Sequence, residues 1–312
     1  MSGPPDSVLV GDALREAGES VGEELRIEPL AGGASRDLWL ISSGSRRWVL
    51  RRDPPGEIAL TSREAEFAVQ VAAHEAGVPV PRPIAFGDFG SPGMLMEFVE
   101  GESIARRVLR ASPAGLVQQI GAAVAALGRV DIGPLEQLMP APADPCQKAV
   151  DSVREELALT GEPLPVLELG LRWLTLNSPP PDRVGVVHGD LRLGNFLVGD
   201  GGLVALMDWE FWHLGDPLED LAWVRARPWR FGADDRPVAG LGSMNELVEG
   251  LGWEPEPERL RWWDVISQAK WGAYCARQAA LRREGEHASL ERTVLGRRVA
   301  EAEWDMLELI EG

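Results

Sequence analysis

The chain has 312 residues and a formal net charge of −18, so it can bury a large core but lacks the basic surface of a general nucleic-acid or anionic-membrane binder. No apolar run approaches the ~20 residues that cross a bilayer, and the first residues lack the basic and apolar parts of a signal peptide. Its 2 cysteines are far apart, which predicts neither a disulfide framework nor a paired-cysteine metal site. We therefore expect a cytoplasmic protein that binds neither nucleic acid nor membranes; the oligomeric state is left open.

One compositional bias concerns the cations. Of the 31 basic residues only Lys148 and Lys270 are lysines, and the others are arginines. A GC-rich coding bias is a sufficient explanation at most positions.

The N-terminal hundred residues predict a small antiparallel sheet with one inserted helix. A short helix over residues 8–18 precedes three strands between residues 24 and 52, which are separated by a glycine turn and a Ser-Gly turn. Two adjacent prolines make residues 53–60 a loop. Two further strands are expected over residues 82–88 and 93–101.

The inserted helix is expected over residues 61–77. Thr61 is the predicted N-cap, Glu64 lies three residues later as in a capping box, and Gly77 ends the helix.

From Ile104 onward the pattern is mainly helical. Apolar residues recur at helical spacing in four segments, which are residues 114–130, 165–177, 256–283 and 287–310. Four tryptophans of the last two segments are expected in the core rather than stacked on a ligand, namely Trp262, Trp263, Trp271 and Trp304. The predicted architecture is α+β and bilobal, with a lobe over residues 1–100, a hinge at residues 97–101 and a helical lobe over residues 101–312.

Residues 186–210 place four polar side chains among apolar and glycine residues. Short buried strands are predicted over residues 184–187, 196–198 and 203–207. The polar residues lie at their ends and in the connections between them, namely His188, Asp190, Asn195 and Asp208. Functional side chains are common in such loops, because the sheet holds them while a ligand can still reach them.

The spacing of these residues suits magnesium–phosphate chemistry. Mg²⁺ takes one or two protein oxygens together with substrate phosphates, and Asn195 and Asp208 can supply such oxygens. Asp190 is then left to orient a substrate hydroxyl and accept its proton.

The motifs HGDLRLGN and LMDWE resemble the catalytic loop and metal motif of the aminoglycoside phosphotransferase family, a small-molecule branch of the protein-kinase-like fold. The similarity extends over roughly residues 25–225, through LAGGAS, WVLRR, the inserted helix, MLMEFVEG and GDPLEDLAW. The run VLRRDPPG is most similar to the branch associated with acyl-CoA dehydrogenases.

The resemblance implies a role for each matching residue. Asp190 would be the catalytic base, and Asn195 and Asp208 the magnesium ligands. The remaining matching residues would bind the nucleotide. Ser35 would donate a hydrogen bond to the phosphates, and Arg51 would replace the usual lysine, with Glu64 as its partner on the helix. Glu97 and Val99 would hold the adenine through their backbone groups.

Several of these residues have a simpler structural explanation. Glu64 needs no catalytic role as part of a capping box on Thr61. His188 is expected to brace the loop rather than transfer a proton. Asp216 would start a helix, Asp220 would brace the catalytic loop, and Glu210 would assist the metal or remain solvated.

The sequence thus predicts a kinase that uses ATP or GTP with Mg²⁺. The acceptor would be a hydroxyl of a small molecule such as an aminoglycoside, an amino alcohol or a hydroxyacyl compound. Two rivals stay open: a nucleotide-binding pseudoenzyme, suggested by Arg51, and a hydrolase with a transition metal at His188, Asp190 and Asp208.

Overall fold

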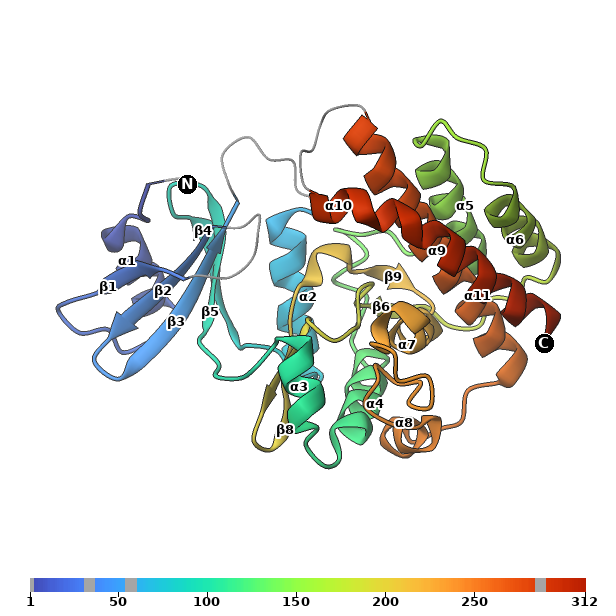
Figure 1. The fold of residues 1–312 in the computed structure, drawn as a ribbon. Coiled ribbons are helices and arrows are strands. Elements are labelled where there is room, and N and C mark those ends of the chain that lie inside the picture. Colours follow the sequence, from blue (N-terminus) through green and yellow to red (C-terminus); the bar gives the residue numbers. More distant parts are fainter. Residues whose placement is uncertain (1–2, 31–36, 54–60, 284–289) are drawn as a thin grey trace.

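The structure is a computed structural model that describes residues 3–30, 37–53, 61–283 and 290–312, without the side chains of residues 290–292. Figure 1 shows a β-sheet at one end of the molecule and a large group of helices at the other. The bilobal α+β architecture predicted from the sequence is confirmed.

The N-terminal sheet has five antiparallel strands in the order β1-β2-β3-β5-β4. They are β1 (Arg26–Pro29), β2 (Asp37–Ser43), β3 (Arg46–Arg52), β4 (Pro83–Asp88) and β5 (Pro92–Glu97). Side chains alternate between the two faces of a strand. Trp48 and Leu50 of β3 therefore share one face with Trp39 and Ile41 of β2, where helix α1 (Ser7–Glu16) packs on them. Arg51 faces the other way, toward helix α2 (Arg63–Glu75).

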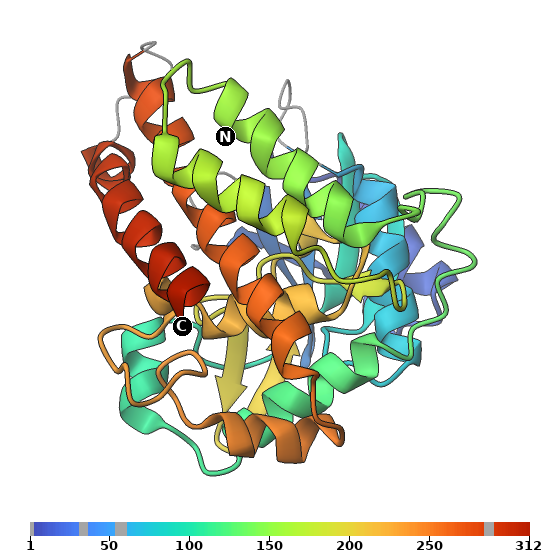
Figure 2. The ribbon, with the colours of Figure 1, turned by 90° about the vertical axis from the view of Figure 1, so that its right-hand side faces the viewer.

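The rest of the chain is mainly helical. Its larger helices are α3 (Ala105–Ala111), α4 (Leu116–Leu127), α5 (Pro145–Ala158), α6 (Pro165–Leu176), α7 (Leu218–Arg225), α8 (Met244–Leu251), α9 (Pro257–Arg283), α10 (Leu290–Leu295) and α11 (Val299–Glu311). Helix α9 is the central one, and α5, α6, α7 and α11 pack around it (Figure 2). Helices α4 and α8 approach closely, since a Cβ added at Gly121 would lie 2.2 Å from the Leu247 carbonyl oxygen.

Two short antiparallel pairs interrupt these helices. One joins β6 (Gly185–Val187) to β9 (His213–Gly215), and the other is the hairpin of β7 (Phe196–Gly199) and β8 (Gly202–Leu206). All four strands contribute buried side chains, so the connections between them are held by the core.

Three expectations from the sequence are wrong in detail. The segment 287–310 is not one helix: from residue 290 it consists of α10, a 3₁₀ turn over Gly296–Arg298, and α11. Trp304 is 64% exposed, whereas Trp262, Trp263 and Trp271 are buried as predicted. The N-cap of α2 is Ser62, whose side chain accepts a hydrogen bond from Ala65 N.

Within the described ranges, no helix combines the length and the apolar character needed to span a membrane.

Candidate active site

The β7–β8 hairpin brings the polar residues of the sequence motif together at its open end. Asn195 directly precedes β7, while Met207 and Asp208 follow β8. The backbone of Met207 is held on both sides: its N–H donates to the Asn195 carbonyl (2.8 Å), and its carbonyl accepts from His188 Nε2 (2.9 Å). The position of Asp208 is therefore tied to both the loop before β7 and the end of β6.

Asp190 is 8% exposed and accepts hydrogen bonds on both carboxylate oxygens. Oδ2 accepts from Asn195 Nδ2 at 2.7 Å, and Oδ1 accepts from Trp223 Nε1 at 2.9 Å. Arg192 Nε lies 2.8 Å from Oδ1 and 3.0 Å from Oδ2. Hydrogen bonds from several donors fix the orientation of this carboxylate.

His188 braces this loop, as predicted. It is fully buried, its Nε2 donates to Met207, and its Nδ1 accepts from the Asp190 backbone N–H at 3.3 Å. Burial lowers the pKa of His188 to about 4, which keeps the imidazole neutral at physiological pH. With both ring nitrogens hydrogen-bonded, His188 has no lone pair to offer a transition metal.

Asp220 is the buried brace that the sequence predicted. Its two carboxylate oxygens accept from the backbone N–H groups of His188 (2.6 Å) and Gly189 (2.9 Å). Burial raises the pKa of Asp220 to about 6, and these two hydrogen bonds act against that rise. Gly189 adopts φ +81°, and a Cβ there would lie 2.3 Å from the Phe211 carbonyl oxygen, so only glycine fits.

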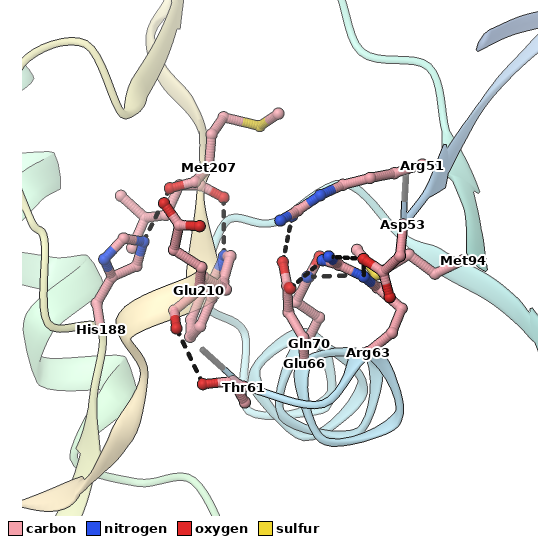
Figure 3. A network of polar contacts seen from close by, with 12 residues as sticks. Arg51, Asp53, Thr61, Arg63, Glu66, Gln70, Met94, His188, Met207 and Glu210 are labelled. Carbon is pink, nitrogen blue, oxygen red and sulfur yellow. Dashed lines mark hydrogen bonds and ion pairs between the residues drawn. The ribbon is translucent and has the colours of Figure 1, made fainter. Parts of the chain in front are cut away.

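Asp208 has a left-handed backbone (φ 72°, ψ 60°), an uncommon conformation that Asp tolerates better than most residues. It opens a 3₁₀ turn over Trp209–Phe211. The turn is anchored to the start of α2, because Thr61 Oγ1 donates to the Glu210 carbonyl at 2.9 Å (Figure 3). Thr61, expected as a helix cap, thus ties the start of α2 to the turn that follows Asp208.

The donor set of this region fits a magnesium ion. The amide of Asn195 is oriented by Nδ2, which donates to both the carbonyl and the carboxylate of Asp190. Among the described residues none donates a hydrogen bond to Asn195 Oδ1, so this oxygen is available as a ligand. Oxygen ligands of this kind suit a hard cation. In contrast, no three His, Cys, Asp or Glu side chains of the described ranges gather as a metal site.

Arg51 forms a buried ion pair with Glu66, not with Glu64 (Figure 3). Glu66 also pairs with Arg63, which in turn pairs with Asp53, so four charges form a chain between β3 and α2. Because the helix begins at Arg63 and turns by about 100° per residue, Glu64 points to solvent while Glu66, two residues later, faces the sheet. The predicted role of Glu64 as partner of Arg51 is therefore wrong.

Arg52 lies on the opposite face of β3 from Arg51. It is 3% exposed, and its guanidinium donates to Asp37 (2.6 Å) and to the Phe89 carbonyl (2.9 Å). Arg52 therefore holds together β2, β3 and the turn before β5, and its removal would destabilise the lobe.

The predicted adenine-binding groups lie at the end of β5 and just after it, at Glu97 and Val99. Glu97 is exposed, and its N–H donates to the Arg82 carbonyl at 2.9 Å. Within the described ranges, no backbone hydrogen bond engages Val99. Ser35, expected at the phosphates, lies outside the described residues.

Sequence reasoning missed a group of residues behind the catalytic loop. Glu219 of α7 lies between Lys270 of α9 (3.0 Å) and His213 of β9 (3.0 Å). Burial alone would raise the pKa of Glu219, but the charges of His213 and Lys270 lower it. The rarity of lysine in this chain was the one signal that could have directed attention to Lys270.

Asp216 starts α7, as predicted, since its Oδ1 accepts from Leu218 N at 2.9 Å. Its Oδ2 also pairs with Arg259 and accepts from Trp263 Nε1 (3.1 Å), which fixes α7 against α9.

Comparison with known proteins places this geometry in a family. The model of the phosphotransferase enzyme family matches residues 26–263. Acyl-CoA dehydrogenase family member 11 of Pongo abelii is 29% identical over 247 residues, which cover 72% of this chain but 32% of that protein. The chain thus spans about a third of the length of such curated relatives.

Solved structures share the fold. A crystal structure from Ralstonia eutropha, assigned as an aminoglycoside phosphotransferase, superposes with a TM-score of 0.81 at 20% identity and covers 98% of both chains. A spectinomycin phosphotransferase in complex with ADP and spectinomycin gives a TM-score of 0.56 at 13% identity, covering 98% of this chain and 95% of that one.

Proposed function

Because the chain belongs to the phosphotransferase enzyme family, we propose that it is a magnesium-dependent kinase that transfers the γ-phosphate of ATP to a hydroxyl of a small molecule. The observation that carries the proposal is the hydrogen-bonded arrangement of Asp190 and Asn195 at the open end of the β7–β8 hairpin, where Asp208 follows. Nucleotide use is supported by the ADP complex of the spectinomycin phosphotransferase with the same fold.

In this proposal Asp190 is the catalytic base. Its carboxylate orients the acceptor hydroxyl toward the γ-phosphate and accepts the proton as the new phosphate ester forms. Arg192, 2.8 Å from Oδ1, holds the carboxylate in place until the acceptor arrives. Trp223 Nε1 fixes the same oxygen from the α7 side.

Asn195 and Asp208 would hold the Mg²⁺ ion through a neutral and a charged oxygen. When bound, the ion would neutralise the negative charge that develops on the phosphate groups during transfer. Asp208 is the stronger ligand of the two because its carboxylate is charged.

The nucleotide would lie between the sheet lobe and the catalytic loop. The backbone of Glu97 and Val99 would hold the adenine, and Ser35 and Arg51 would contact the phosphates. The planar guanidinium group of arginine can bind a phosphate and a carboxylate at the same time. In Arg51, Nη1 is already paired with Glu66. We propose ATP as the donor, with GTP as the alternative.

The surroundings of Asp190 favour a hydroxyacyl compound as the acceptor. Asn195 lies on the metal side of the carboxylate, so the opposite side faces the acceptor. There Trp223 Nε1 donates to Asp190 Oδ1, and the guanidinium of Arg192 lies 4.8 Å from the centroid of the Trp229 ring. These aromatic side chains favour an acceptor that carries an apolar chain. Similarity to proteins named acyl-CoA dehydrogenase family members agrees with this choice.

The buried Arg51–Glu66 pair counts against the rival of a pseudoenzyme with a solvated arginine. Likewise, the two hydrogen-bonded nitrogens of His188 count against a hydrolase with a transition metal.

The proposal is tested by ADP release from Mg·ATP across four acceptor classes: hydroxyacyl thioesters, aminoglycosides, choline-like amino alcohols and sugars. We expect acceptor-dependent ADP release with at least one class, highest for hydroxyacyl thioesters, and its loss in Asp190→Asn. Nucleotide binding without release for any class would favour the pseudoenzyme, and cleavage of phosphoesters without ATP would favour the hydrolase.

A further inference from the structure

Lys270 is exceptional in this chain by its composition and by its place. It is one of 2 lysines among 31 basic residues, and the other, Lys148, is exposed on α5. Lys270 lies on the central helix α9, with its side chain 35% exposed, behind the catalytic loop. A coding bias toward arginine accounts for the 29 arginines but not for a lysine at this position.

The ammonium group of Lys270 makes three contacts, and two of them lead to Asp190. Nζ donates to the carbonyl of Gly189 at 3.1 Å, the peptide that immediately precedes Asp190. Nζ also lies 4.9 Å from the ring centroid of Trp223, whose Nε1 donates to Asp190 Oδ1 at 2.9 Å. The third contact, at 3.0 Å, is with Glu219 Oε1.

A lysine suits these three targets better than an arginine. The ammonium is compact and directs three donors from a single atom, whereas the guanidinium is a wide planar fork. A carbonyl, a carboxylate and an aromatic ring all contact Lys270 Nζ. A planar group could satisfy the two oxygens or stack on the ring, but would have to move one of the partners to do both.

We propose that Lys270 is a positioning residue for Asp190, which it holds through the Gly189 carbonyl and through the Trp223 ring. It does not touch the reacting atoms. It fixes the backbone before Asp190 and the indole beside Asp190, so that the carboxylate keeps the direction needed to meet an acceptor hydroxyl. The inference rests on the proposed kinase function and adds a residue from α9, outside the catalytic motifs.

The competing explanation is that Lys270 only neutralises buried Glu219, which is 8% exposed. The two explanations differ in a Glu219→Gln background, where no carboxylate remains to be neutralised. This background also avoids the destabilisation that an unpaired buried carboxylate would cause in Lys270→Met alone.

The test measures kcat and the KM for ATP with the best acceptor from the panel, in wild type, Glu219→Gln, Glu219→Gln/Lys270→Met and Glu219→Gln/Lys270→Arg. Lys148→Met is the matched control, since it removes the other lysine. We expect Lys270→Met to lower kcat by about tenfold or more in the Glu219→Gln background, since small misplacements of a catalytic group are costly. The KM for ATP should change by less than about twofold, and Lys270→Arg should recover part of kcat, because the charge over Trp223 remains.

An unchanged kcat when Lys270→Met is added to Glu219→Gln would overturn the inference, and so would Glu219→Gln/Lys270→Arg with no more activity than Glu219→Gln/Lys270→Met. If wild type releases ADP and Asp190→Asn does not, while Glu219→Gln/Lys270→Met keeps the kcat of Glu219→Gln, only this inference falls. If wild type phosphorylates none of the acceptors, the proposed function falls, and the inference falls with it.

Discussion

Asp190 is fixed by donors on both of its oxygens, from Arg192, Asn195 and Trp223. Asp190→Asn removes the basic oxygen and places an amide among these donors. We expect kcat to fall by about 10²-fold or more, the usual contribution of a positioned general base, while the affinity for ATP changes little. Steady-state kinetics with the best acceptor, together with ATP titration, measure both quantities. Turnover of Asp190→Asn near the wild-type rate would show that another group takes the proton.

Asp208 is expected to carry most of the affinity for the metal. In Asp208→Ala, the Mg²⁺ concentration that gives half-maximal activity should rise by at least about tenfold, and transfer should be nearly abolished. Glu210→Gln is the comparison, since Glu210 lies in the same turn and the sequence left its role undecided between metal and solvent. A Mg²⁺ requirement equal in wild type and Asp208→Ala would remove Asp208 from the metal site.

At the residue scale, a motif predicts a role better than it predicts a partner. The positions of His188, Asp190 and Asn195 follow from spacing, because a short loop between buried strands leaves few places for them. The partner of Arg51 does not follow. The partner of Arg51 depends on whether α2 begins at Thr61 or at Arg63. A shift of two residues decides whether Glu64 or Glu66 faces β3.

The pairing of α2 with β3 is the element-scale contact on which the phosphate site depends. Glu66 is 1% exposed and serves both Arg51 and Arg63, whereas Glu64 is exposed. Glu66→Gln should cost about 3–5 kcal/mol of unfolding free energy, because the buried carboxylate shared by the guanidinium groups of Arg51 and Arg63 loses its charge. It should also raise the KM for ATP, while Glu64→Gln stays within about 0.5 kcal/mol of wild type.

Urea unfolding and ATP kinetics on both variants measure these effects. Equal, small changes in Glu66→Gln and Glu64→Gln would mean that the ion-pair chain does not support nucleotide binding.

Helices α7 and α9 are also joined by a partly buried ion pair, whose contribution to stability depends on pH. Arg225 Nη1 lies 3.3 Å from Asp264 Oδ2, and burial raises the pKa of Asp264 to about 6, against the opposing effect of Arg225. A carboxyl whose pKa is higher in the folded than in the unfolded chain binds its proton preferentially in the fold. Its contribution to stability therefore increases as the pH falls from about 6 toward the unfolded value near 4.

Asp264→Asn removes this contribution. Between pH 7.5 and pH 4.5, wild type should gain about 1–3 kcal/mol relative to Asp264→Asn. Urea unfolding of both proteins at the two pH values measures the difference. If the difference in unfolding free energy between wild type and Asp264→Asn is the same at both pH values, or changes in the opposite direction, the fold does not raise the pKa of Asp264.

The whole molecule was predictable in outline because its two halves have different periodicities. Alternating residues before residue 100 and helical spacing after it predict a sheet lobe and a helical lobe. The contacts between distant segments were not predictable: Thr61 with Glu210, and Lys270 with Gly189, join residues 149 and 81 positions apart. Such contacts depend on how α2 and α9 pack, and no local pattern encodes that packing.

The most direct test of the account follows the phosphorus atoms themselves. ³¹P NMR of wild type with Mg·ATP and the best acceptor should show a phosphomonoester signal that grows in step with ADP, and Asp190→Asn should show neither at a comparable rate. The appearance of ADP with inorganic phosphate alone, for every acceptor, would contradict the central claim that this site transfers phosphate to a small-molecule hydroxyl.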